Sequence, residues 1–323
     1  MVIKTKMIIL IILIFSLNTK IIYSEMTREE INQHLNAAEI FYSSGNYTSA
    51  LYEFNLIKDI ENMSKEKQIN YYIKLAVCYK NLDIYDKSIE KLNNALEIDK
   101  FNPVIYLNLA EIFEKTGLYE EAIKNYNKVI ELNYKDLFYV YYGLAKINQK
   151  SGLLSKAIEY YTKALTIKLE PEIYKKLSEC YEAMHKFELS SSMLEKYILT
   201  KPTVENYMHL SFLFMIQKKY DKSIDLLNTA KNISSNQDEI DLHLATILFK
   251  KGDFEKSKKI LNELLNKNPE SGLLHFLKGF MLYFENENKN IIIKEMNKSI
   301  KFAKSEMLKN YAEYFLDFIK TKK

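Results

Sequence analysis

The chain has few residues that interrupt helices, with only seven glycines and four prolines among 323 residues, while 47% of its residues are hydrophobic. Glycine and proline are the common residues of turns, so this scarcity argues against a sheet-rich or loop-rich protein and favours long helices. It also leaves little material for a glycine-rich phosphate loop, and the sequence contains neither GxSxG nor HExxH. We therefore expect no catalytic residue and no cofactor.

Excess charge of one sign is also nearly absent. The formal net charge is +4, but three lysines lie in the first 24 residues, which contain no acid, so the remainder of the chain is close to neutral. Nucleic-acid binding therefore has no electrostatic support.

The first 24 residues differ in character from the rest. A basic start precedes an apolar run of 11 residues, Met7 to Leu17, which is shorter than the roughly 20 residues of a membrane-spanning helix. Basic, apolar and polar segments in this order are typical of a secretory signal peptide, here residues 1–24, with cleavage after Ser24. The two isoleucines at positions 21 and 22 leave open the alternative of an uncleaved membrane anchor.

The stretch from Pro103 to Asn133 contains two helical patterns separated by one glycine. Its apolar residues recur three and four positions apart, which places them on one buried stripe per helix. Ala110 and Ala122 are small where the two helices must approach closely, and Gly117 suits the turn between them. Such a helix pair cannot bury its stripe alone, so neighbouring copies are expected.

The pattern recurs eight times with a period near 34 residues. The copies begin at Ile31, Ile69, Pro103, Phe138, Pro171, Val204, Asp238 and Gly272. Four glycines fall at position 15 of a copy, and all four prolines fall at position 1 or 32, where one copy gives way to the next. Copies five and six lack the turn glycine, and the last copy drifts by one residue in its second helix. Residues 61–68 lengthen the first period by four, as a longer loop or a longer second helix.

These copies resemble the tetratricopeptide repeat. The third copy carries the resemblance in Tyr106, Leu109, Ala110, Phe113, Gly117, Tyr119, Ala122 and Tyr126. The resemblance implies an all-α, right-handed superhelical solenoid of antiparallel helix pairs over residues 25–304. One further apolar stripe, in residues 305–323, predicts a C-terminal capping helix that covers the last copy. The resemblance also implies that the protein binds other proteins.

The cysteines and histidines give little indication of chemistry. Cys78 and Cys180 occupy position 10 of copies two and five, too far apart for a disulfide, so we expect two small buried residues. His209 and His243 share position 6 of adjacent copies and could approach each other, but no third ligand is evident, whereas zinc sites need three or four. We predict no metal site.

In the tetratricopeptide family, positions 2, 5, 9, 12 and 13 of each copy line a concave face that binds peptides. In copies one to five this face carries charges: Glu39, Lys80, Glu114, Lys146 and Glu182. In copies six to eight it is mostly apolar, and there we predict the protein-binding residues Met208, Phe212, Met215, Ile216, Leu242, Phe249, Phe276, Phe280 and Tyr283.

Methionines and aromatic rings suit an apolar or amphipathic helix of a partner, because methionine adapts its shape and rings bury a large area. The alternative is that these residues are core, covered by a tightening superhelix or by the terminal helix folding inward.

The sequence thus predicts an exported, non-enzymatic scaffold that binds a protein or peptide in the periplasm or cell envelope of a bacterium. Contact with a membrane is expected only through an uncleaved N-terminal segment. Two alternatives remain: a structural subunit that assembles with itself, and an accessory subunit of an enzyme complex in the envelope.

Overall fold

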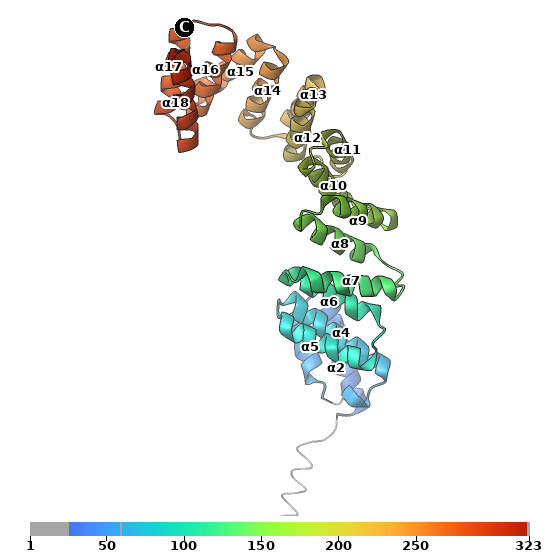
Figure 1. Ribbon diagram of the computed structural model, residues 1–323. Helices are drawn as coiled ribbons and strands as arrows, with labels where there is room; N and C mark the ends of the chain where they lie inside the picture. Colours follow the sequence, from blue (N-terminus) through green and yellow to red (C-terminus); the bar gives the residue numbers. More distant parts are fainter. Residues whose placement is uncertain (1–25, 59, 322–323) are drawn as a thin grey trace, which may run out of the picture. The chain divides into compact units, whose positions relative to one another are not determined.

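The computed structural model describes residues 26–58 and 60–321 (Figure 1). The predicted signal peptide lies outside the described residues. Within these ranges the regular structure consists of 17 α-helices and one short 3₁₀-helix, with no strand. No helix among the described residues is long and apolar enough to cross a membrane.

The helices follow one another as eight consecutive pairs and one final helix. They are α2 (Arg28–Ser43) and α3 (Tyr47–Leu56), α4 (Lys65–Asn81) and α5 (Tyr85–Ile98), α6 (Pro103–Thr116) and α7 (Tyr119–Glu131), α8 (Phe138–Lys150) and α9 (Leu154–Ile167), α10 (Pro171–Ala183) and α11 (Phe187–Ile198), α12 (Val204–Ile216) and α13 (Tyr220–Ile233), α14 (Asp238–Lys251) and α15 (Phe254–Lys267), α16 (Gly272–Phe284) and α17 (Lys289–Lys301), and α18 (Glu306–Thr321).

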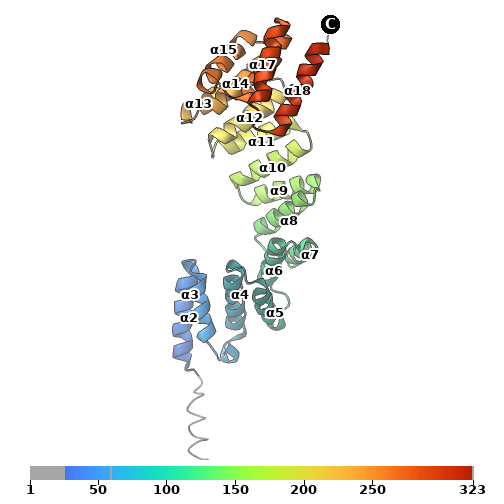
Figure 2. The ribbon, with the colours of Figure 1, turned by 90° about the vertical axis from the view of Figure 1, so that its left-hand side faces the viewer.

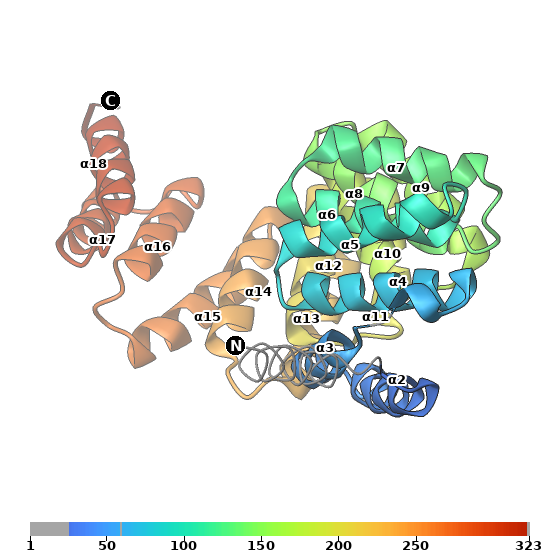
Figure 3. The same ribbon diagram turned by 90° about the horizontal axis from the view of Figure 1, so that it is seen from below.

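The chain forms two compact units. One contains α2 to α8 and residues 162–167, and the other contains residues 154–161 and α10 to α18. Within each unit, packing joins consecutive helices and is most extensive between the two helices of a pair. Figure 2 shows this for α2 with α3 in the first unit, and Figure 3 for α16 and α17 in the second. The predicted fold class, an all-α solenoid of helix pairs, is confirmed.

The turn inside each of the eight pairs has the same backbone conformation, with a positive φ at position 15. The four position-15 glycines have φ between 74° and 92°: Gly45, Gly117, Gly152 and Gly252. The copies without this glycine place another residue there at φ between 54° and 59°: Asp83, His185, Lys218 and Asn286. Only glycine adopts this left-handed conformation without steric cost, so the weaker copies keep the turn at some expense of stability.

A buried serine replaces the position-20 alanine in copies two, five, six and seven. The hydroxyls of Ser88, Ser223 and Ser257 each donate a 2.6 Å hydrogen bond to the carbonyl 12 residues earlier, in the first helix of the same copy. In copy five, the hydroxyls of Ser190 and Ser178 are 2.9 Å apart. The residue therefore stays small at the helix crossing, and its polar atom is satisfied.

The four extra residues between the first two copies are not in a longer second helix. Helix α3 is the shortest α-helix, with 10 residues, and a 3₁₀ turn at Ile60–Asn62 follows it. Helix α4 then begins at Lys65, four residues before the copy frame, because the side chain of Ser64 caps its first turn by accepting from the amide of Lys67. The insertion is divided between the connection and the start of α4.

The drift in the last copy is confirmed and has a packing reason. Helix α17 begins one position later than the other second helices. A Cβ atom at Gly279 would lie 2.1 Å from the terminal methyl of Met296, so the glycine makes room for this larger side chain. Beyond α17, helix α18 packs on α16 and α17 and buries Ala312, Leu316 and Ile319.

Both cysteines are buried and unbridged, as predicted. Burial raises the pKa of the Cys78 thiol to about 12, and burial followed by the nearby Glu179 raises that of Cys180 to about 11. Neither thiol is therefore poised to act as a nucleophile.

Replacement of Ala122 by leucine should lower the free energy of unfolding by about 1 to 3 kcal/mol through overpacking. Ala122 is fully buried on the stripe of α7 that packs against α6. Lys124, two positions along the same helix, is exposed, so Lys124→Leu is the matched control and should change stability little. Urea unfolding monitored by circular dichroism measures both, and equal losses would contradict the repeat frame.

Candidate protein-binding groove

The nine predicted binding residues lie on the first helices of the last three pairs: Met208, Phe212, Met215 and Ile216 on α12, Leu242 and Phe249 on α14, and Phe276, Phe280 and Tyr283 on α16. None of them is fully buried. Phe212 and Ile216 are 41% and 37% exposed, and the other seven are half-buried. They therefore do not form a closed core.

Two hollows lie between these helices. The larger, of about 240 Å³, is lined by Phe212, Met215, Leu242, His243, Thr246, Ile247 and Leu277. The smaller, of about 40 Å³, lies between α14 and α16 beside Phe249 and Phe280, and Thr246 and Leu277 line both hollows. Side chains of α12, α14 and α16 thus form one mainly apolar groove.

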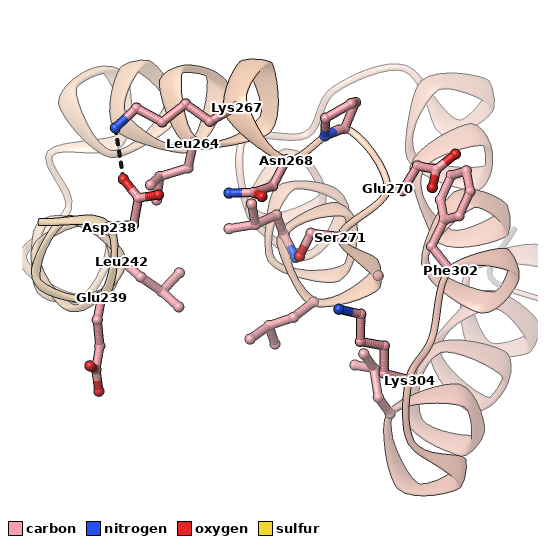
Figure 4. Close-up of a pocket in the computed structure, with 15 residues that line it drawn as sticks. Asp238, Glu239, Leu242, Leu264, Lys267, Asn268, Glu270, Ser271, Phe302 and Lys304 are labelled. Carbon is pink, nitrogen blue, oxygen red and sulfur yellow. Dashed lines mark hydrogen bonds and ion pairs between the residues drawn. The ribbon is translucent and has the colours of Figure 1, made fainter. Parts of the chain in front are cut away.

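A third hollow, of about 950 Å³, opens where α14 and α16 begin (Figure 4). Leu242 lines this hollow as well as the 240 Å³ hollow, so the two are adjacent. At one end Lys267 Nζ pairs with Asp238 Oδ1 at 2.7 Å, and from the opposite side Lys304 extends toward Ser271 (Figure 4). Sequence reasoning missed this hollow because loop residues 268–271 form part of its wall, and repeat positions do not describe loops.

Helix α18 covers part of the groove on α16. The ring of Phe315 lies 6.3, 5.2 and 5.4 Å from the rings of Phe276, Phe280 and Tyr283. Phe280 in turn lies 6.0 Å from Phe249 on α14. An aromatic cluster therefore runs from α14 to α18. The alternative, in which the terminal helix folds inward and covers the predicted residues, therefore holds in part for the three residues on α16. On α12, Phe212 and Ile216 remain exposed.

Each charged concave residue of copies one to five pairs with a side chain of an adjacent copy. In the first unit, ion pairs join Glu39 to Lys74, Lys80 to Glu111, and Glu114 to Lys146. In the second unit, His209 Nε2 lies 2.8 Å from Glu182 Oε2. Each pair links the first helices of adjacent copies, so these side chains hold neighbouring copies together. The sequence signal was available, since opposite charges recur about one period apart on the concave face.

This pairing also accounts for one of the two histidines considered for a metal. His209 contacts Glu182, whereas His243 lines the 240 Å³ hollow. Among the described residues, no group of three or more potential ligands is close enough to hold a metal ion.

Repeated helix pairs with a conserved turn geometry define an α-helical repeat protein. Two segments of the chain, residues 102–170 and 214–278, match family models described as tetratricopeptide repeat. The chain is a tetratricopeptide repeat protein. Proteins of this kind serve as scaffolds for protein–protein interaction, and the fold supports the same general role here.

Three solved structures illustrate the likeness. The C-terminal part of a repeat-containing protein from Cytophaga hutchinsonii matches with a TM-score of 0.58 and 17% identity, over 74% of this chain and 98% of that one. A tetratricopeptide repeat protein from Parabacteroides merdae matches with a TM-score of 0.47 and 15% identity, over 79% of this chain and 100% of that one. MamA from Desulfovibrio magneticus matches with a TM-score of 0.45 and 14% identity, over 53% of this chain and 97% of that one. Among curated proteins there is no significant match. At these identities the Cytophaga structure shows the fold alone.

Proposed function

We propose that this protein is an exported, non-enzymatic scaffold that binds an apolar segment of another protein in the groove formed by α12, α14 and α16. The observation that carries the proposal is the change along the concave face. In copies one to five the charged side chains are engaged with one another, whereas in copies six to eight the apolar side chains remain partly exposed.

The chemistry of the groove indicates the kind of segment that it suits. Phe212 and Ile216 stand four residues apart on α12 and are both exposed, and Met215 lines the hollow beside them. Apolar side chains of a partner helix, spaced by three or four residues, can fill such a hollow while its polar face stays in water. An extended polar peptide would leave the same side chains uncovered.

Replacement of Phe212 by serine should weaken capture of the partner from an envelope extract and leave the melting temperature nearly unchanged. The aromatic ring is 41% exposed, so it supplies contact area to a partner while adding little to the core. Capture on immobilised protein, followed by mass spectrometry of the bound proteins, measures the effect.

The matched control is Tyr52→Ser, because Tyr52 is 65% exposed on α3, remote in sequence from the groove. A protein captured by the wild type and by Tyr52→Ser, but lost with Phe212→Ser, supports the groove. Equal capture by the wild type and both variants would rule the groove out as the binding site. Phe280 is less suitable as a probe, since its ring contacts Phe249 and Phe315 and its loss should also lower stability.

Export gives a separate prediction. The mature protein should begin near Glu25 and should fractionate outside the cytoplasm, in the periplasm or cell envelope. Intact mass spectrometry of the protein from each cell fraction tests both points. An intact N-terminus in the membrane fraction would instead support the anchored form, and an intact N-terminus in the cytosol would contradict export.

A further inference from the structure

Helix α18 carries a second apolar stripe in addition to the one that packs on α17. Met307, Tyr311, Tyr314 and Phe318 are 68%, 59%, 76% and 43% exposed. Their spacings of four, three and four residues place them on one side of the helix, whereas the buried residues Ala312, Leu316 and Ile319 occupy another. Single exposed apolar residues are ordinary, but a continuous stripe of four marks an interaction surface.

The stripe does not lie on the side of α18 that corresponds to the contact between the first and second helices in the eight pairs. Helix α18 begins at Glu306, one 34-residue period after Gly272, where α16 begins, so Glu306 is position 1 of a further copy. Glu313 then stands at position 8, where Ala110 of α6 is buried. Glu313 is exposed, as is Asp317 four residues later. This side of α18 is therefore suited to water, and the stripe lies apart from it.

From the stripe we infer that two copies of this chain associate through their α18 helices, packed antiparallel about a two-fold axis. Heptad spacing of this kind is the pattern by which helices pair. With the axis between residues 312 and 313, Tyr311 of one copy meets Tyr314 of the other, and Met307 meets Phe318. Every member of the stripe thus has an apolar counterpart, as an isologous contact requires.

The flanking residues fit this arrangement. Asn310 and Asp317 border the stripe on the same side, and the two-fold axis brings Asn310 of one copy close to Asp317 of the other. An amide can donate to a carboxylate, so the pairing is favourable, whereas two carboxylates there would repel each other.

The exposed area is sufficient for a weak dimer. With about 200 Å² for a large side chain, the exposed fractions of the four stripe residues amount to roughly 500 Å² per copy. Standard interfaces bury about 800 Å² per partner. The stripe therefore supplies most of one side of such an interface.

Sedimentation velocity over a range of about 1 to 100 μM should show a reversible monomer–dimer equilibrium of the purified protein. The variant Tyr311→Glu with Tyr314→Glu places like charges opposite each other in its own dimer and should weaken association at least about 100-fold. The variant Tyr311→Lys with Tyr314→Lys should do the same, and an equal mixture of the two variants should restore the dimer through Glu–Lys pairs. Far-UV circular dichroism should show unchanged helical content in both.

Two further variants complete the test. Tyr52→Glu and Phe212→Ser alter exposed side chains outside α18, and both should keep the wild-type equilibrium. If either charged variant unfolds, Tyr314→Ser replaces it, with a smaller expected loss of association. A monomer at every concentration overturns the inference, and so does a dimer that survives in both charged variants. Neither result decides the groove test, since that test uses Phe212, which is not part of the α18 contact.

Discussion

Replacement of His275 by alanine should lower the free energy of unfolding of the last repeats by roughly 3 to 5 kcal/mol, the usual loss when one partner of a buried ion pair is removed. His275 is only 5% exposed. Its Nδ1 lies 2.6 Å from Glu295 Oε2, and its Nε2 lies 2.9 Å from the carbonyl oxygen of Pro269. A carbonyl only accepts, so Nε2 carries a proton and donates, and a second proton is shared between Nδ1 and the carboxylate.

The pH dependence of this loss has a definite sign. Burial disfavours the charged form of Glu295, but the hydrogen bond from His275 and the charges of Lys278 and Lys298 outweigh it, so the pKa of Glu295 lies below its ordinary value of 4.5. In the wild type, this carboxylate therefore stabilises the fold above pH 4.5, and its contribution is lost as the pH falls further. Without His275, burial should raise the pKa of Glu295, so the folded variant gains stability by taking up a proton. The difference in stability between wild type and variant should therefore narrow as the pH falls, because Glu295 takes up a proton at a higher pH in the variant than in the wild type.

His209→Ala is the matched control in the same unit. His209 also pairs with a glutamate, Glu182, but the two side chains are 35% and 31% exposed, so about 0 to 1 kcal/mol should be lost. Hydrogen exchange of α16 and α17, together with urea unfolding, distinguishes the two cases. A loss below about 1 kcal/mol for His275→Ala, or a loss that does not change with pH, would show that the pair is not a buried ion pair.

Much of the fold follows from short-range patterns in the sequence. The repeat frame predicted the start of six of the eight first helices, because proline, glycine and the three–four apolar spacing act within a few residues. Helices α2 and α4 begin three and four residues before the frame. It also located the turns that lack glycine, although His185 and Lys218 give no local indication of a positive φ. There the neighbouring helices impose the turn on a residue that does not favour it.

The candidate site was less predictable, because exposure depends on how far neighbouring copies separate. The frame placed Phe212, Phe249 and Phe280 on the correct helices, but it did not predict how much of each ring is exposed. Contacts among rings about 30 residues apart, such as Phe249 with Phe280 or Phe280 with Phe315, decide that cover. A one-dimensional pattern does not contain these contacts. The hollow at loop residues 268–271 was missed because repeat positions do not describe loops.

A double-mutant cycle at Gly143 and Tyr126 should give strongly non-additive losses. Tyr126 on α7 is 1% exposed, and its hydroxyl donates a 2.9 Å hydrogen bond to Glu114 Oε2. A Cβ atom built on Gly143 of α8 would lie 2.3 Å from both Cζ and the hydroxyl oxygen of that tyrosine. In the middle of a helix, alanine is normally favoured over glycine by about 1 kcal/mol. Here the clash should reverse the sign, so that Gly143→Ala loses about 1 to 3 kcal/mol.

Tyr126→Ala should lose about 3 to 5 kcal/mol, because it leaves a cavity where a fully buried ring packed and removes the hydroxyl that bonds Glu114. In that background the clash at Gly143 no longer exists, and the added methyl partly fills the cavity. Gly143→Ala should then be neutral or stabilising by up to about 1 kcal/mol, which gives a coupling energy of roughly 1 to 4 kcal/mol. Urea unfolding of the four proteins measures the cycle. If the two losses simply add, Tyr126 does not pack against Gly143, and α7 and α8 do not approach each other through this ring.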